Sequence, residues 1–151
     1  MKMAYLSIPG DPMAKQRHRV TKKGRAYTPA QTVNYENLVK YAYKSLNSDI
    51  FWDCEPISMH ILAVFRIPKS YSKKKVSDCL SGKIAPSTKD VDNIAKIICD
   101  GLNNVAYSDD KHIAELYVAK CYSADPKKYG VKITIKDFKI ENINAMYRGV
   151  E

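Results

Sequence analysis

The chain has 151 residues, of which 45% are hydrophobic and 27% are charged, a composition typical of one globular domain and unlike that of disordered or collagen-like chains. Its net charge of +9 favours an anionic partner, and nucleic acid is the most common partner of such proteins. No run approaches the roughly 18 apolar residues of a membrane span, and Pro9-Gly10 interrupts the N-terminus before a signal peptide can form, so we expect no membrane association.

The first third of the chain predicts a strand, a basic loop and a helix. Residues 3–8 alternate in polarity and end at Pro9-Gly10, and residues 10–27 form a loop or hairpin that turns at Gly24. A helix is expected from Thr28 to about Asn47, with Thr28 as its cap and Gln31 completing a capping box. Its predicted buried stripe consists of Val33, Leu38, Tyr41, Ala42 and Leu46.

The rest of the chain predicts three more strands and two more helices. The expected elements are a strand over 57–67, a short helix over 70–80, a helix over 92–101, and strands over 112–123 and 131–140. The short turn at 125–130 indicates that the last two strands pair as an antiparallel hairpin. This order predicts an α+β fold, a small mixed or antiparallel sheet with helices packed on one face. We expect one domain over 1–140 and a loosely held C-terminal tail over 141–151.

Charge is distributed unevenly along the chain. Residues 1–48 contain nine Lys or Arg and two acidic residues, whereas residues 90–115 contain six acidic residues and two Lys. The basic cluster predicts contacts with a nucleic-acid backbone, although a solvated mobile loop has the same composition; its members are Lys15, Arg17, Arg19, Lys22, Lys23 and Arg25. A second run that includes Lys73 and Lys74 fits DNA contact and an ordinary solvated helix face equally well.

The acidic segment begins with Asp90-Val91-Asp92. Two carboxylates two residues apart point the same way only in extended chain, so we expect extended chain entering a helix, with Asp92 as the N-cap and Val91 turned into the core. From there the spacing is helical, and Asp92, Lys96 and Asp100 fall on one face. The opposite face is apolar and consists of Ile94, Ile97, Ile98 and Leu102.

Asp109-Asp110 stands just before the strand at 112, and a carboxylate there can return to meet Asp90 and Asp92. Clustered carboxylates persist either because water screens them or because a cation neutralises them. Oxygen-only ligands indicate Mg²⁺ or Mn²⁺, and Lys96 would add a positive charge near a bound phosphate. A solvated acidic face without function remains the alternative.

These motifs resemble the RusA family of Holliday-junction resolvases. The similarity lies in Asp90-Val91-Asp92-Asn93-Ile94-Ala95-Lys96, in Asp100-Gly101-Leu102-Asn103, in Ser108-Asp109-Asp110, and in the basic segments 12–19 and 24–29. Gln16 stands where many relatives have Pro, but the neighbouring Arg residues remain.

The resemblance implies a homodimeric Mg²⁺-dependent endonuclease without a small-molecule cofactor that resolves four-way DNA junctions by paired symmetric nicks. It implies Asp90, Asp92 and Asp110 as metal ligands, with Asp109 as the weaker candidate of its pair, and Lys96 as the essential cation. It also implies the cytoplasm of a bacterial or phage-infected cell. The alternatives are a nuclease that prefers other branched DNA and a basic DNA-binding protein without catalytic activity.

Overall fold

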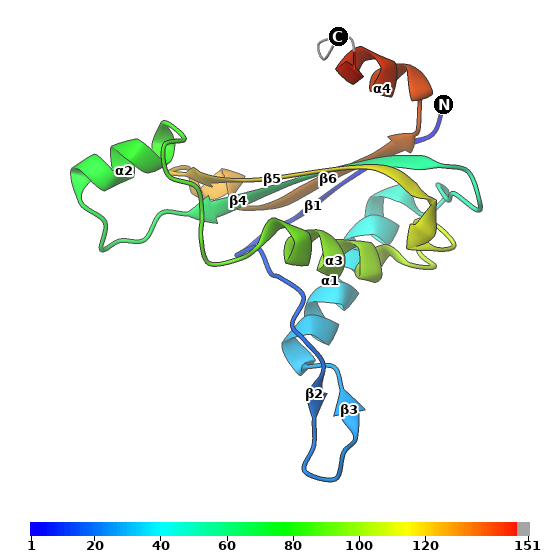
Figure 1. The fold of residues 1–151 in the computed structure, drawn as a ribbon, viewed down its shortest axis with the longest axis horizontal. Coiled ribbons are helices and arrows are strands. Elements are labelled where there is room, and N and C mark those ends of the chain that lie inside the picture. The colour runs from blue at the N-terminus through cyan, green and yellow to red at the C-terminus, as the bar shows by residue number, and fades with distance from the viewer. Residues whose placement is uncertain (148–151) are drawn as a thin grey trace.

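A computed structural model describes residues 1–147, and it is built around one four-stranded sheet (Figure 1). The strand order across the sheet is β1-β6-β4-β5, with bounds Met3–Ile8 for β1, Gly130–Asp137 for β6, Ile57–Arg66 for β4 and Ile113–Ser123 for β5. β6 runs antiparallel to both β1 and β4, whereas β5 runs parallel to β4. The sheet is therefore mixed.

The sheet has one covered face because its strands alternate. Ala4, Leu6 and Ile8 of β1 are buried while Met3 and Tyr5 are exposed, and β6 repeats the pattern with Val131, Ile133 and Ile135. Such alternation of buried and exposed residues is typical of strands in a sheet with one buried and one solvated face.

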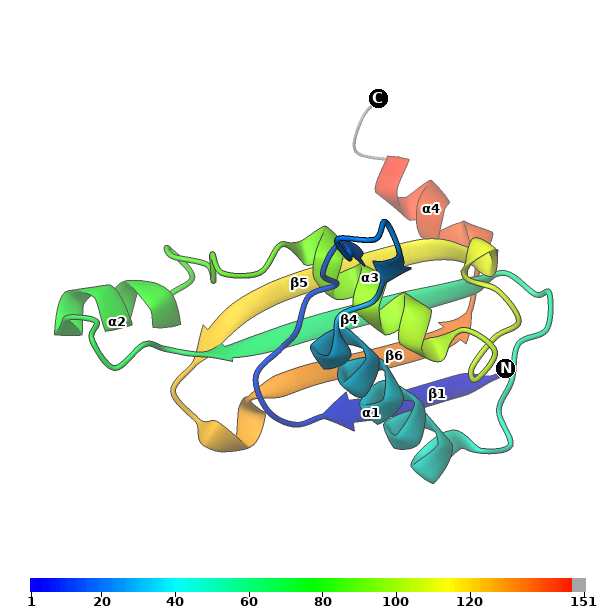
Figure 2. The ribbon, with the colours of Figure 1, turned by 90° about the horizontal axis from the view of Figure 1, so that it is seen from below.

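Two helices, α1 (Ala30–Asn47) and α3 (Val91–Leu102), lie across that covered face (Figure 2). They pack closely, since a Cβ added at Gly101 of α3 would lie 3.1 Å from Cβ of Val39 in α1. The predicted α+β class is confirmed. No helix within residues 1–147 combines the length and apolar character needed to cross a membrane.

The other elements extend away from this core. The hairpin of β2 (Arg19–Val20) and β3 (Ala26–Tyr27) projects from the side of the two helices, and α2 (Lys73–Leu80) lies beyond one end of the sheet (Figure 1). At the opposite end, residues 141–147 of the segment expected to be a tail belong to α4 (Ile140–Tyr147), and the remaining tail residues lie outside the described part of the chain. Two short 3₁₀ turns, η1 (Asp110–His112) and η2 (Pro126–Lys128), precede β5 and β6.

The predicted hairpin of the last two strands is wrong. β4 lies between β5 and β6, so the two strands are joined by η2 without being neighbours in the sheet. β5 instead returns parallel to β4 after the crossover through α2 and α3, as parallel pairing requires. Alternation along a strand specifies which face is buried but not which strand is its partner.

The predicted buried stripe of α1 is also wrong, except at Ala42, which is partly buried against the core. Tyr41 is 71% and Leu46 is 69% exposed, whereas the buried residues are Thr32, Tyr35, Val39, Tyr43 and Asn47. Two polar members of this face, Tyr43 and Asn47, form hydrogen bonds to other parts of the protein. The Tyr43 hydroxyl donates to O of Ile50 at 2.6 Å, and the Asn47 side-chain amide donates to O of Tyr5 at 2.9 Å.

The expected start of α1 also differs from the structure. Pro29 is the N-cap and Ala30 the first helical residue, so Thr28 does not cap the helix. Thr28 Oγ1 lies 3.3 Å from Nδ1 of His18 instead, across the base of the β2–β3 hairpin.

Candidate active site

The N-terminus of α3 presents two carboxylates. Asp90, not Asp92, is the N-cap: its backbone is extended and its carbonyl accepts the N–H of Ile94 at 3.0 Å. Asp92 lies in the first turn, and Val91, expected in the core, is 40% exposed. Asp90 makes no capping hydrogen bond with its side chain, so its carboxylate is available for other interactions. Both charges lie near the positive end of the helix dipole.

The two faces of α3 follow the predicted spacing. Ile94, Ile97, Ile98 and Leu102 are fully buried, and the polar face carries Asp92, Lys96 and Asp100. Nζ of Lys96 lies 3.4 Å from Oδ1 of Asp100, one turn further along the helix. The hydrophobic contacts therefore orient this polar edge away from the sheet core.

A tight turn after α3 reverses the chain toward the same helix. Asn104 adopts a left-handed conformation with φ of +62°, and its N–H donates to O of Tyr107 at 2.7 Å. Tyr107 is fully buried, and its hydroxyl donates to O of Cys99 in α3 at 2.8 Å. Asp110 follows this anchored tyrosine by three residues, which returns it to the side of α3.

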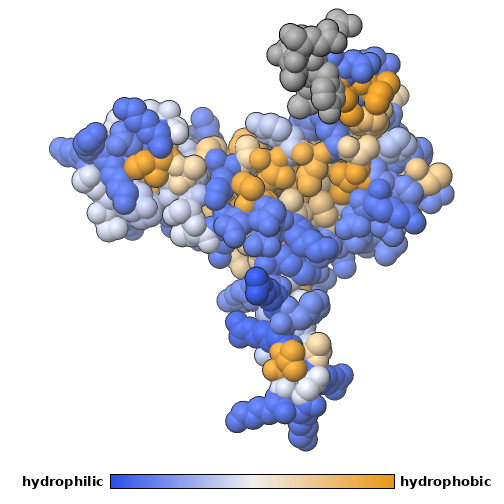
Figure 3. Space-filling model, in the orientation of Figure 1, coloured by the Kyte–Doolittle hydropathy of each residue, from blue (hydrophilic) through white to orange (hydrophobic). Residues whose placement is uncertain are grey.

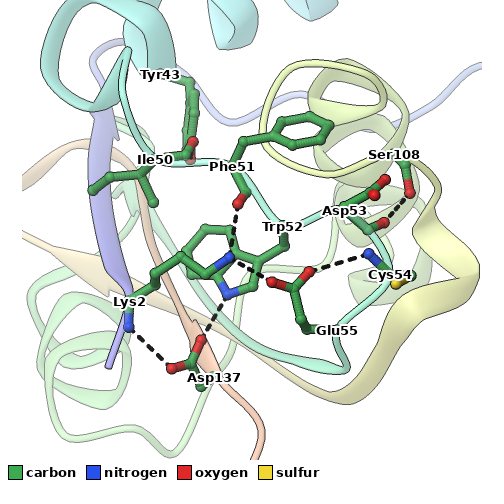
Figure 4. Close-up of polar contacts among 10 residues, drawn as sticks. All are labelled: Lys2, Tyr43, Ile50, Phe51, Trp52, Asp53, Cys54, Glu55, Ser108 and Asp137. Atoms are coloured by element: carbon green, nitrogen blue, oxygen red, sulfur yellow. Dashed lines mark hydrogen bonds and ion pairs between the residues drawn. The ribbon is translucent and has the colours of Figure 1, made fainter.

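The segment around Trp52 holds this turn from the other side (Figure 4). The N–H of Trp52 donates to O of Ala106 at 2.9 Å, and the N–H of Ser108 donates to O of Trp52 at 3.1 Å. The buried indole N–H donates to Oδ1 of Asp137 at 2.8 Å, which links the segment to the end of β6. Trp52 was not a functional candidate in the sequence, yet it supports the chain that carries Asp110.

One open pocket of about 360 Å³ is lined by three of the four predicted catalytic residues. Asp92 and Lys96 reach it from α3 and Asp110 from η1, and its apolar wall includes Ile113 and Leu116 of β5. A phosphate entering this pocket would meet one ammonium and two carboxylates beside a nonpolar surface.

The adjacent residues Asp109 and Asp110 differ in their surroundings. The Asp109 carboxylate accepts the N–H of Lys111 at 2.9 Å, and this hydrogen bond lowers its pKa. Burial and the neighbouring Asp109 raise the pKa of Asp110, while Lys96 opposes the shift. Asp110 is thus the carboxyl group of the pair that lines the pocket and lacks full charge compensation.

The carboxylates fit a hard cation. Asp92 and Asp110 provide oxygen donors in one pocket, and Mg²⁺ is usually bound by one or two carboxylates, waters and a substrate phosphate. Asp90 stands two residues from Asp92 but does not line the pocket. Within residues 1–147 no three His, Cys, Asp or Glu side chains gather closely enough to hold a metal by themselves.

The basic residues predicted to contact nucleic acid fall into two groups that differ in exposure, and all of them except Lys15 are exposed. Arg17, Arg19, Lys22, Lys23 and Arg25 are exposed on or beside the β2–β3 hairpin, and Lys73 and Lys74 are exposed on α2.

Lys15 differs from these residues because only 17% of its side chain is exposed and its Nζ contacts Glu36 and Asp100. Burial works to lower its pKa, but hydrogen bonds to those two carboxylates outweigh burial and raise it. Sequence spacing contained no signal for this contact, since the three residues belong to three different segments.

Comparison with known proteins supports the family resemblance of the sequence motifs. The chain is 39% identical over 85 residues to the Bacillus subtilis (strain 168) protein named "Uncharacterized protein YqaN", and the match covers 54% of this chain and 58% of that protein, little more than half of either. Residues 9–136, which contain the basic segment, α3 and the Asp109-Asp110 turn, match the family described as Endodeoxyribonuclease RusA. The chain belongs to the RusA endodeoxyribonuclease family.

Proposed function

We propose that this protein is a Mg²⁺-dependent, structure-selective endodeoxyribonuclease that resolves four-way DNA junctions by paired symmetric nicks. The observation that carries the proposal is the single pocket in which Asp92, Lys96 and Asp110 meet, in a family member with a net charge of +9. Nucleases of this family are generally metal-dependent.

Asp92 and Asp110 would hold the ion in the pocket, and Asp90 at the adjacent N-cap would be the third carboxylate. The Asp109 carboxylate would stay with the backbone N–H of Lys111. Mn²⁺ would substitute because it prefers the same oxygen donors. When bound, the ion supplies positive charge at the phosphate and a more acidic water. The Lys96 ammonium would stabilise the negative charge that develops on the phosphate oxygens.

DNA would be held by the exposed basic residues. The β2–β3 hairpin carries Arg19 and Arg25 and forms a projection that is mostly hydrophilic apart from a small hydrophobic spot, and the surface of α2 is also largely hydrophilic (Figure 3). Basic side chains of this kind bind backbone phosphates without regard to sequence, so selectivity would come from the shape of the junction. A homodimer would match the near two-fold symmetry of a four-way junction and place one pocket at each nick.

The test is cleavage of a synthetic mobile four-way junction in Mg²⁺, against linear duplex of the same sequence. We expect symmetric nicks in the junction only, none in EDTA, and none with Asp92→Asn, which should still bind the junction. Asp49→Asn, at an exposed residue between α1 and β4, is the matched control.

Four outcomes would contradict the proposal. Equal cutting of junction and duplex would exclude structure selectivity, and cutting by Asp92→Asn at the normal rate would exclude the pocket. Binding without cleavage by the unmodified protein would indicate a DNA-binding protein that is not a nuclease, and preferential cutting of flaps would indicate a nuclease for other branches.

A further inference from the structure

Four charged side chains form a chain of contacts that leads from the N-terminal segment to the pocket. Nζ of Lys15 contacts Oε1 of Glu36 in α1 and lies 3.1 Å from Oδ2 of Asp100 in α3. The second oxygen of Asp100 lies 3.4 Å from Nζ of Lys96, which lines the pocket. Asp100 thus connects Lys15 to Lys96.

Three of these four side chains are largely shielded from water, and only Lys96 is mostly exposed. Exposed fractions are 17% for the side chains of Lys15 and Glu36, 20% for Asp100 and 57% for Lys96. Charges that are partly buried interact more strongly than exposed ones and are less screened by salt. Two positive and two negative groups balance here, so removing one leaves an uncompensated charge beside the pocket.

The main chain also fixes Lys15. Its N–H donates to O of Asn93 in α3 at 2.8 Å, and the preceding Met13 and Ala14 pack against the core. Lys15 is therefore anchored to α3 by backbone and side chain, whereas Arg17 and Arg19 are exposed toward the hairpin.

We propose that Lys15 is a positioning residue of the active site, which acts through Asp100 to hold Lys96 at the pocket, and that it does not contact DNA. The inference rests on the proposed function. Without Lys15, Asp100 would pair with Lys96 alone, draw its ammonium along the helix, and leave an extra negative charge where a phosphate must bind.

A double-mutant cycle tests whether Lys15 acts on Lys96 through Asp100. Single-turnover cleavage is measured at saturating junction and Mg²⁺ for Lys15→Gln, Asp100→Asn and the double variant. We expect each single variant to be slower by about tenfold or more, as for displacement of a transition-state charge. The double variant should be no slower than the slower single one, because both changes break the same connection. Lys44→Gln, at an exposed lysine in the last turn of α1, should cleave at the unmodified rate.

A second pair of measurements separates positioning from simple stability and from DNA contact. Adding Glu36→Gln to Lys15→Gln removes the carboxylate left without its partner, and should recover thermal stability without recovering the cleavage rate. The salt dependence of junction binding should be unchanged in Lys15→Gln, whereas loss of a phosphate contact at Arg17→Gln should lower the slope by about one.

The results that would overturn the inference are distinct from those against the nuclease. Cleavage by Lys15→Gln at the unmodified rate, multiplicative losses in the double variant, or a slope reduced by about one in Lys15→Gln would each overturn the positioning role alone. Absence of cleavage by the unmodified protein would overturn the proposed function and this inference with it.

Discussion

Asp109 and Asp110 show how far two adjacent identical residues can differ. The first carboxylate accepts the N–H of Lys111 at the start of η1, and the second lines the same pocket as Asp92. Hydrogen bonding lowers the pKa of Asp109, whereas burial and the nearby carboxylate raise the pKa of Asp110. A cation bound between Asp92 and Asp110 would relieve this excess of negative charge.

The pair therefore provides a matched test. We expect Asp110→Asn to reduce junction cleavage by about 100-fold or more, because a charge that holds the ion is lost. Asp109→Asn should reduce cleavage far less, since the Asn side-chain oxygen can still accept the N–H of Lys111 and cap the 3₁₀ turn. Single-turnover cleavage in Mg²⁺ would measure both variants, and thermal melts would show that each one folds. Equal losses at both positions would contradict the assignment of the pocket to Asp110.

At the level of elements, the β2–β3 hairpin is held together by its own turn. The N–H of Thr21 donates to O of Arg25 at 2.9 Å, and the N–H of Gly24, at φ of +81°, donates back to O of Thr21 at 2.9 Å. All four of its strand residues are exposed. Because the hairpin adds nothing to the buried core, substitutions there should alter binding without lowering stability.

Neutralising the hairpin tests its contact with DNA. The triple variant Lys22→Gln/Lys23→Gln/Arg25→Gln should lower the slope of log K against log salt by up to about three, if each side chain contacts one phosphate. Its melting temperature should match that of the unmodified protein. The variant Lys73→Gln/Lys74→Gln applies the same measurement to α2. An unchanged slope in the triple variant would show that the hairpin is not the DNA-binding element.

For the whole molecule, Asp137 connects three distant parts of the chain. It accepts the indole N–H of Trp52 at 2.8 Å and the backbone N–H of Lys2 at 3.0 Å, at the end of β6 (Figure 4). The hydrogen bond from Trp52 is the main cause of its lowered pKa, and the N–H of Lys2 adds to the shift. A lowered folded-state pKa stabilises the fold above the unfolded value of about 3.9, and this contribution disappears as pH falls through the folded value.

Asp137→Asn should therefore reduce the free energy of unfolding at pH 7 and have a smaller effect near pH 3, where the unmodified protein has begun to lose the same contribution. Urea unfolding at the two pH values would measure the difference. Asp125→Asn, in the turn before η2, is the control for general loss of charge. A destabilisation that is equal at both pH values would show that ionisation of Asp137 is not the cause.

Local spacing was sufficient for much of α3. Residues four apart share a helix face whatever surrounds the helix, so the polar edge of Asp92, Lys96 and Asp100 and its apolar opposite were predictable. The family motif depends on the same short spacings. The two-residue shift of the N-cap, from Asp92 to Asp90, reflects the competition between two good capping residues that stand close together in the sequence.

Contacts between distant segments determine the features of the fold and of the pocket that the sequence did not predict. Which strand pairs with β5, which face of α1 is buried, and which carboxylate of Asp109-Asp110 enters the pocket all depend on segments far apart in the chain. Lys15 is the clearest case: by composition it belongs to a basic run, and only the approach of α1 to α3 gives it Glu36 and Asp100 as partners. Periodicity describes one element at a time, whereas these contacts arise when elements meet.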